Sequence, residues 1–114
     1  MQIPKQKAVK KKRKHKKSIL QKKDGTCYLC VQEGIYRMWP YLEEHHVFDG
    51  PNRIHSEAEG LKVYLCIDHH RGREGVHNNI SLMRKLQQQA QREYEKTHSR
   101  QQFMELIGRN YLEE

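Results

Sequence analysis

The chain of 114 residues is 35% hydrophobic, with a formal net charge of +8 at pH 7 and a mean hydropathy of −1.08. This length fits one small domain with a tail, and so few apolar residues predict a thin core that needs a metal or disulfides. No apolar run approaches about 18 residues, and the charged N-terminus precedes no apolar segment. We therefore expect no membrane span, no secretory signal and a cytoplasmic location. Three cysteines, an odd number, favour reduced thiolates on a metal over a disulfide framework.

Residues 1–23 carry most of the positive charge. They contain 11 lysines or arginines and no acid, which leaves 11 basic against 14 acidic residues in the rest of the chain. Like-charged sequence of low complexity predicts a disordered basic arm. Such an arm attracts nucleic acid by releasing counterions from phosphates. The candidate contacts are Lys10, Lys11, Lys12, Arg13, Lys14, Lys16 and Lys17. A solubilising or nuclear-import tail is the alternative.

Residues 24–114 form the predicted domain, whose first half is rich in turns. A strand is predicted over Leu42–Phe48, ending at an Asp-Gly-Pro turn, and a second over Leu61–Leu65. The loop of about a dozen residues between them is long enough to suggest a function. A helix is expected to start near Ile67.

Residues 81–112 are predicted to be helical. Apolar side chains repeat at four-residue spacing after Ser81, a candidate N-cap, at Leu82, Leu86, Ala90 and Tyr94. Ser99 with Gln102 resembles a capping box, and Gly108 is a natural helix end. We expect both helices to pack over the metal region, with a dimer or partner surface as the alternative. The fold class is therefore α+β.

Two cysteine-containing pairs have the spacing of metal knuckles. Cys27 and Cys30 form one pair, and Cys66 and His69 form the other. Two such knuckles close a tetrahedral site, and three thiolates with one imidazole suit structural zinc. Spacing favours His69 over His70 as the fourth ligand. The alternative is ordinary buried thiols and a helix histidine.

Six of the eight histidines lie between His45 and His77. If zinc takes His69, the others include the adjacent pair His45 and His46, together with His70 and His77. Phosphodiester hydrolysis needs a general base near neutral pKa and a cation that stabilises phosphate charge. One imidazole of the pair can bind a divalent ion while its neighbour acts on water. The alternative is a set of exposed histidines without a role.

Four segments carry a resemblance to a known family: CYLC, EEHHVFDGPNR, GLKVYLCIDHH and GVHNN. Together they resemble the HNH (ββα-metal) endonucleases, and in particular small phage-type members akin to RecA-dependent phage recombination nucleases. The resemblance covers roughly residues 25–110. It implies a zinc-stabilised ββα-metal core and hydrolysis of DNA, and because a domain of this size has few elements for base readout we expect low sequence specificity. It also implies a bacterial or phage-infected cell and, as a candidate partner, a recombinase filament.

The resemblance also implies roles for single residues. His46 matches the general base, and His45 and His70 match ligands of a catalytic Mg²⁺ or Mn²⁺, or of a second Zn²⁺. His77 is a further candidate ligand or phosphate contact. The family usually has an asparagine before the second strand that orients the base, but this chain has Glu59-Gly60-Leu61 there. The candidate substitute is Asn52, with the alternatives at Asn78 and Asn79.

Three arginines flank this centre and are candidate DNA phosphate contacts: Arg53, Arg71 and Arg73. The alternative is a solvated surface. Trp39 is expected to be a core anchor rather than a platform for stacking bases. The rival function is a non-catalytic zinc module that binds nucleic acid, and a third is a scaffold that uses the C-terminal helices.

Overall fold

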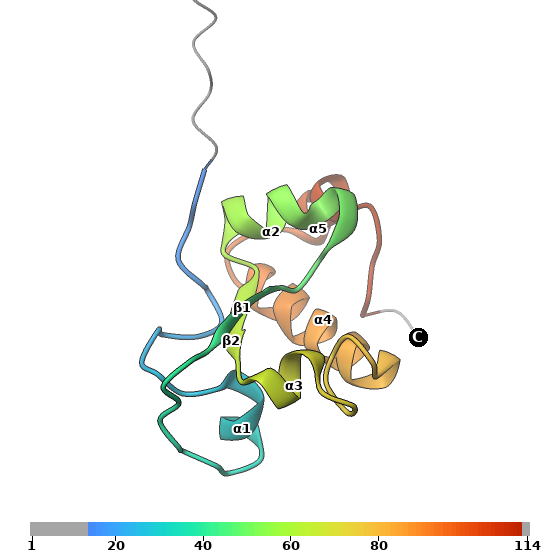
Figure 1. The fold of residues 1–114 in the computed structure, drawn as a ribbon. Coiled ribbons are helices and arrows are strands. Elements are labelled where there is room, and N and C mark those ends of the chain that lie inside the picture. The colour runs from blue at the N-terminus through green and yellow to red at the C-terminus, as the bar shows by residue number, and fades with distance from the viewer. Residues whose placement is uncertain (1–13, 113–114) are drawn as a thin grey trace, which may run out of the picture.

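The computed structural model describes residues 14–112 and confirms an α+β fold with a two-stranded sheet (Figure 1). The predicted contacts Lys10, Lys11, Lys12 and Arg13 lie outside the described residues. No described helix is long and apolar enough to cross a membrane. In chain order the elements are α1 (Tyr28–Gln32), β1 (Glu43–His46), a 3₁₀ turn η1 (Gly50–Asn52), α2 (Arg53–Glu59), β2 (Lys62–Leu65), α3 (Ile67–Arg71), α4 (Ile80–Tyr94) and α5 (Arg100–Ile107).

The strands β1 and β2 pair antiparallel in a short sheet, which we call the hairpin, and each lies within a strand predicted from the sequence. His45 pairs with Val63 and His46 pairs with Lys62. Because side chains alternate along a strand, the pairs fall on two faces. One face carries His45 and the buried Val63 and Leu65. The other carries His46 with Glu44, Lys62 and Tyr64, so adjacent histidines project to opposite sides of the hairpin.

The connection between the strands is not the loop that we expected, because it contains η1 and α2. Ser56, on α2, is buried, and its hydroxyl donates to the carbonyl of Phe48 and accepts from the Phe48 amide. Gly60 ends α2 with φ of 71°, a left-handed conformation that favours glycine. These tertiary contacts stabilise a seven-residue helix that local sequence patterning does not reveal.

Residues 14–23, expected to belong to the disordered arm, instead run beside β2 and α2 (Figure 1). The amide of Lys16 donates to Glu57 O and the amide of Ile19 donates to Gly60 O. A Cβ at Gly60 would overlap the carbonyl of Lys17, so the close approach of this segment needs glycine there. The described part of the arm is therefore attached to the domain by backbone hydrogen bonds.

The C-terminal helices confirm the capping box and the glycine stop but not the first N-cap. The side chain of Asn79, rather than Ser81, accepts from the Leu82 amide and caps α4, since α4 begins one residue before Ser81. Ser99 and Gln102 cap α5 reciprocally, and Gly108 ends it with φ of 89°. In Figure 1, α5 lies beside α2 at one end of the hairpin, and α1 and α3 lie at the other end.

The core joins both halves of the chain through aromatic contacts. The ring of Phe48 lies 5.4 Å from that of Phe103 and 5.2 Å from that of Tyr111, between ring centroids. Phe103 is fully buried and also contacts Tyr94. Trp39 is half-buried against the core, as its predicted anchor role requires.

Truncation of Phe103 tests this packing. We expect Phe103→Ala to lower the free energy of unfolding by about 3–5 kcal/mol, because it removes a buried ring and leaves a cavity. Met104→Ala, at the adjacent exposed position, is the control and should cost far less. Urea denaturation of both variants measures the difference, and equal losses would contradict the assignment of α5 to the core.

Candidate metal centres and the His46 pocket

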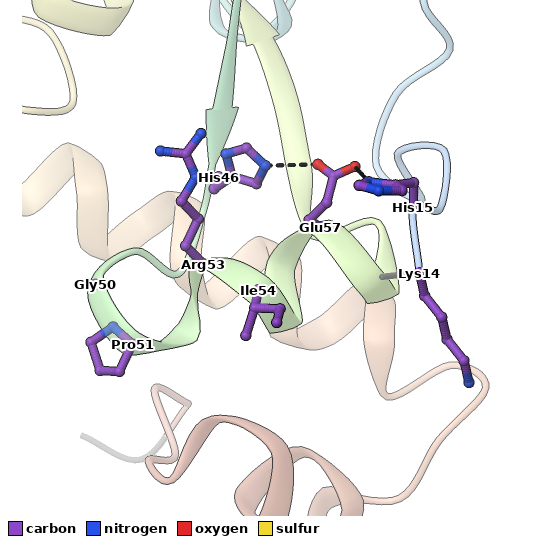
Figure 2. A pocket seen from close by; sticks show the side chains of 8 residues that line it. All are labelled: Lys14, His15, His46, Gly50, Pro51, Arg53, Ile54 and Glu57. Atoms are coloured by element: carbon purple, nitrogen blue, oxygen red, sulfur yellow. Dashed lines mark hydrogen bonds and ion pairs between the residues drawn. The ribbon is translucent and has the colours of Figure 1, made fainter. Parts of the chain in front are cut away.

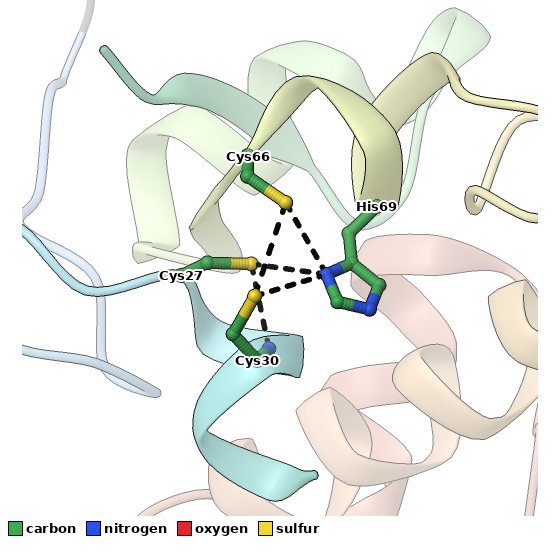
Figure 3. A group of neighbouring side chains, drawn as sticks. All are labelled: Cys27, Cys30, Cys66 and His69. Carbon is green, nitrogen blue, oxygen red and sulfur yellow. Dashed lines mark hydrogen bonds between the residues drawn. The ribbon is translucent and has the colours of Figure 1, made fainter. Parts of the chain in front are cut away.

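Two separate segments converge on a cluster of three thiols and one imidazole (Figure 3). Cys27 is the N-cap of α1 and Cys30 lies within it, while Cys66 follows β2 and His69 lies on α3. All three cysteines are buried and none forms a disulfide. The structure therefore brings the predicted ligand set together, and its fourth residue is His69 rather than His70.

The spacing within this cluster fits one tetrahedral ion. The Nδ1 of His69 lies 3.4, 3.3 and 3.3 Å from the sulfurs of Cys27, Cys30 and Cys66, and the sulfurs of Cys30 and Cys66 are 3.9 Å apart. Zinc with its usual bond lengths sets sulfur and nitrogen about 3.5 Å apart, and two sulfurs about 3.8 Å apart. The four side chains can thus hold a metal such as zinc without rearrangement.

The surroundings of the cluster suit a metal ligand set. Burial raises the pKa of the Cys30 thiol to about 12, and ligation requires the thiolate, so binding of a divalent ion here releases a proton. The Nε2 of His69 donates to Glu33 Oε1 at 3.0 Å. A carboxylate on the outer nitrogen fixes the orientation of a ligating imidazole and leaves Nδ1 with its lone pair toward the sulfurs.

A second cluster contains His45, His70 and His77, one nitrogen of each lying within 4.8 Å of the others. His45 comes from β1 and His70 from α3, directly after His69. The loop after α3 folds back, with the amide of Val76 donating to His69 O and the Nε2 atoms of His70 and His77 only 3.0 Å apart. A Cβ at Gly75 would lie 2.7 Å from Asp68 O, so this tight return requires glycine.

Burial and charge in this second cluster keep the ring of His45 neutral and able to bind a cation. Burial, and then the neighbouring His70 and His77, lower the pKa of His45 to about 3, so its ring is neutral at physiological pH. Among residues 14–112, the buried Nε2 of His45 has no hydrogen-bond partner. An orphaned buried nitrogen beside two further imidazoles is what a cation site requires.

Glu43 orients His70 in the same way that Glu33 orients His69. His70 Nδ1 donates to Glu43 Oε1 at 2.9 Å, which leaves Nε2 facing the cluster. Arg71 binds both oxygens of Glu43, at 2.8 and 2.7 Å. These hydrogen bonds, first from His70 and then from Arg71, lower the pKa of Glu43 to about 2. Arg71, predicted to contact phosphate, therefore also holds the carboxylate that orients His70.

His46 lies on the opposite face of β1 and lines an open pocket of about 460 Å³ with Lys14, His15, Arg53 and Glu57 (Figure 2). Its Nε2 donates to Glu57 Oε1 at 2.8 Å. Burial raises the pKa of Glu57, but hydrogen bonds from His46, His15 and Lys62 outweigh it and hold the pKa at about 2. An ionised Glu57 accepts a hydrogen bond from Nε2–H of His46, which leaves Nδ1 as the nitrogen that does not face Glu57.

Glu44, His46 and Glu57 also lie close enough to form a metal-like cluster. The ammonium of Lys62 already lies 3.0 Å from Glu57 Oε1 and 3.6 Å from Glu44 Oε1. A buried lysine that neutralises both carboxylates occupies the place of a cation and repels a second one. We therefore assign this cluster to ion pairing rather than to a metal.

The orienting role predicted for Asn52 falls to Glu57 in this geometry. The amide of Asn52 donates to Ile107 O, at the end of α5, and Asn79 caps α4. Asn78 donates to Gly72 O. Sequence patterning missed Glu57 because α2 was taken for a loop. The helical spacing of Arg53 and Glu57, four residues apart, is the one local signal that places both on one helix face.

The predicted basic contacts take different positions. Arg53 and Lys14 line the His46 pocket, and in Figure 2 Arg53 lies on the side of His46 away from Glu57. Lys16 and Lys17 are exposed on the described part of the arm. Arg73 is exposed beside His69, outside the His46 pocket.

Comparison of the chain with protein-family models, curated proteins and solved structures finds no significant match in any of the three. The family resemblance remains a prediction from the motifs. Function is therefore inferred from the two clusters and the His46 pocket.

Substitutions in and beside the thiol cluster test whether it binds a structural metal. We expect Cys66→Ser to lose bound zinc and to unfold, because such a site contributes about 10–16 kcal/mol of apparent binding energy, which is comparable to or larger than the stability of a small domain. Glu33→Gln should keep the fold and weaken zinc binding about 10- to 100-fold. Native mass spectrometry and circular dichroism measure both. A folded Cys66→Ser with unchanged thermal unfolding would contradict a structural metal site.

Proposed function

We propose that this chain is a metal-dependent endonuclease of the HNH (ββα-metal) type that hydrolyses DNA phosphodiester bonds with little sequence specificity. The observation that carries the proposal is the cluster of His45, His70 and His77 at the strand end that also bears His46 and its carboxylate partner. The order of β1, β2 and α3, with imidazoles on β1 and α3, supports the same family.

The chain's own groups supply the base. His46, with Nε2–H held by ionised Glu57, presents Nδ1 to accept a proton from the attacking water. A carboxylate that fixes the tautomer and stabilises the imidazolium is the arrangement used by histidine bases in hydrolases. Glu57 is thus a positioning residue for His46.

Arg53 and Lys14, in the same pocket as His46, are placed to bind the phosphate oxygens. A guanidinium pairs with phosphate through two hydrogen bonds and so orients it for attack. The short hairpin offers few side chains for base edges, which fits low sequence specificity.

Two metal roles complete the proposal. Zinc on Cys27, Cys30, Cys66 and His69 is structural, because all four positions of a tetrahedral ion are filled by protein ligands. His45, His70 and His77 would hold a divalent ion that would supply charge stabilisation to the scissile phosphate, which would have to lie across the end of β1 to meet both this ion and His46 on the opposite face. Mg²⁺, Mn²⁺ and a second Zn²⁺ are the candidates, and nitrogen donors favour the transition ions over Mg²⁺ in affinity.

The first functional test compares histidine variants in a plasmid nicking assay with Mg²⁺, Mn²⁺ or Zn²⁺. We expect His46→Ala to lower the rate about 10²- to 10⁴-fold, because it removes the general base. His70→Ala should lose activity as well as the second bound ion. His55→Ala, on α2 without an assigned role, is the matched control and should cut like wild type.

The same assay separates the rival function. A wild-type chain that binds DNA but cuts no DNA form with any of the three ions is a non-catalytic binding module. Equal rates for His46→Ala and His55→Ala in a chain that does cut would place the base elsewhere.

Glu57→Gln tests the positioning role. A neutral amide still accepts the Nε2 proton but loses the charge, and hydrogen bonds to charged groups contribute about 1.5–3 kcal/mol, so we expect kcat to fall about tenfold or more. Glu59→Gln, on the same helix, is the control. Both should be assayed well below their melting temperatures, because Glu57 also pairs with Lys62. Equal kcat for the two variants would refute the role.

A further inference from the structure

The hairpin face that carries His46 continues into a groove that the proposed chemistry does not use. On this face Glu44 pairs with Tyr64 next to the pair of His46 and Lys62. Two hollows of about 420 and 440 Å³ lie along it, and Tyr64 and Lys23 line both. The hollows therefore adjoin at these two side chains, one beside the arm and the other at Trp39, and we call them together the Tyr64 groove.

The walls of the Tyr64 groove are aromatic and its rim is basic. Trp39 and Pro40 line one end and Tyr64 the centre. The Nζ of Lys23 lies 5.3 Å from the centroid of the Tyr64 ring, and the guanidinium of Arg37 lies 4.3 Å from that of Trp39. A cation over a ring face is attracted by the ring quadrupole, so a base that stacks on Tyr64 would replace Lys23 there.

Charge points to a polyanionic occupant. Lys17, Lys22 and Lys23 line the groove and are exposed, whereas Glu44 is its single acid. Burial raises the pKa of Tyr64, so its hydroxyl stays neutral and adds no negative charge at physiological pH. The basic segment also leads past Gly60 to Lys14 in the His46 pocket.

We propose that the Tyr64 groove binds single-stranded DNA, with unpaired bases stacked on Tyr64, next to the core-anchored Trp39 at the end of the groove, and with phosphates on the lysine rim. Stacking platforms inside positively charged grooves are how proteins bind single strands without reading sequence. Bases within a duplex do not expose their faces, so the groove selects unpaired DNA. This inference rests on the proposed function in one respect: it assigns the substrate an unpaired segment beside the bond that is cut.

The test measures binding alone, without added divalent ions, so that it does not depend on cleavage. Anisotropy compares labelled oligothymidylate of about 16 nucleotides with an abasic strand and a duplex of equal length. We expect oligothymidylate to bind about 5-fold or more tightly than the abasic strand, because each stacked base contributes about 1–3 kcal/mol. Trp39 is the single tryptophan, so oligothymidylate should also quench the intrinsic fluorescence of the wild-type chain.

Tyr64→Leu should weaken binding of oligothymidylate about 5-fold or more and leave duplex binding nearly unchanged. Tyr36→Leu is the matched control, since Tyr36 is 72% exposed and lines neither hollow. Lys23→Ala against Lys85→Ala tests the rim in the same way. Sedimentation of both tyrosine variants measures self-association, which would change if a second copy of this chain occupied the groove.

Three results would overturn the proposal. One is equal affinity for abasic and normal strands without quenching of Trp39, which needs no variant. Another is an equal effect of Tyr64→Leu and Tyr36→Leu. The third is a change of self-association in Tyr64→Leu with single-strand affinity unchanged. A chain that never cuts DNA can still satisfy the expected result, so failure of the nuclease proposal is distinguishable.

Discussion

The convergence of Cys27, Cys30, Cys66 and His69 is the constraint on which the rest of this small fold depends. It joins α1, the end of β2 and α3, and neither of these two helices exceeds five residues or could persist alone. His70 follows His69 directly, so fixing one imidazole on the thiols fixes the helix that directs the other toward His45. A metal held by the first cluster would thus fix the geometry of the second.

Carboxylates repeat one role across the site. Glu33, Glu43 and Glu57 each accept a hydrogen bond from a histidine of the site, His69, His70 and His46 respectively, at 3.0, 2.9 and 2.8 Å. Each hydrogen bond selects one tautomer of the imidazole and directs its second nitrogen away from the carboxylate. Residues 24–114 are mildly negative, with 14 acidic against 11 basic residues, and these glutamates contribute to that charge, whereas the excess of positive charge lies in residues 1–23.

Local rules predicted the local features. The knuckle spacing at Cys27 and Cys66, the strands, and the capping box at Ser99 depend on neighbours within a few residues, and the structure contains them. The helix α2 depends on the buried contact of Ser56 with Phe48, and the position of residues 14–23 depends on hydrogen bonds to α2, Gly60 and β2. These are long-range contacts, so a charge run was taken for disorder and α2 for a loop. Glu57 was missed for the same reason.

The central claim is that a thiolate-bound ion places three imidazoles around a second ion. Anomalous X-ray scattering from crystals grown with Zn²⁺ tests it most directly. The account predicts two peaks: one about 2.3 Å from three sulfurs, and one about 2.0–2.1 Å from a nitrogen each of His45, His70 and His77. A single peak, or a second peak away from these imidazoles, would contradict it.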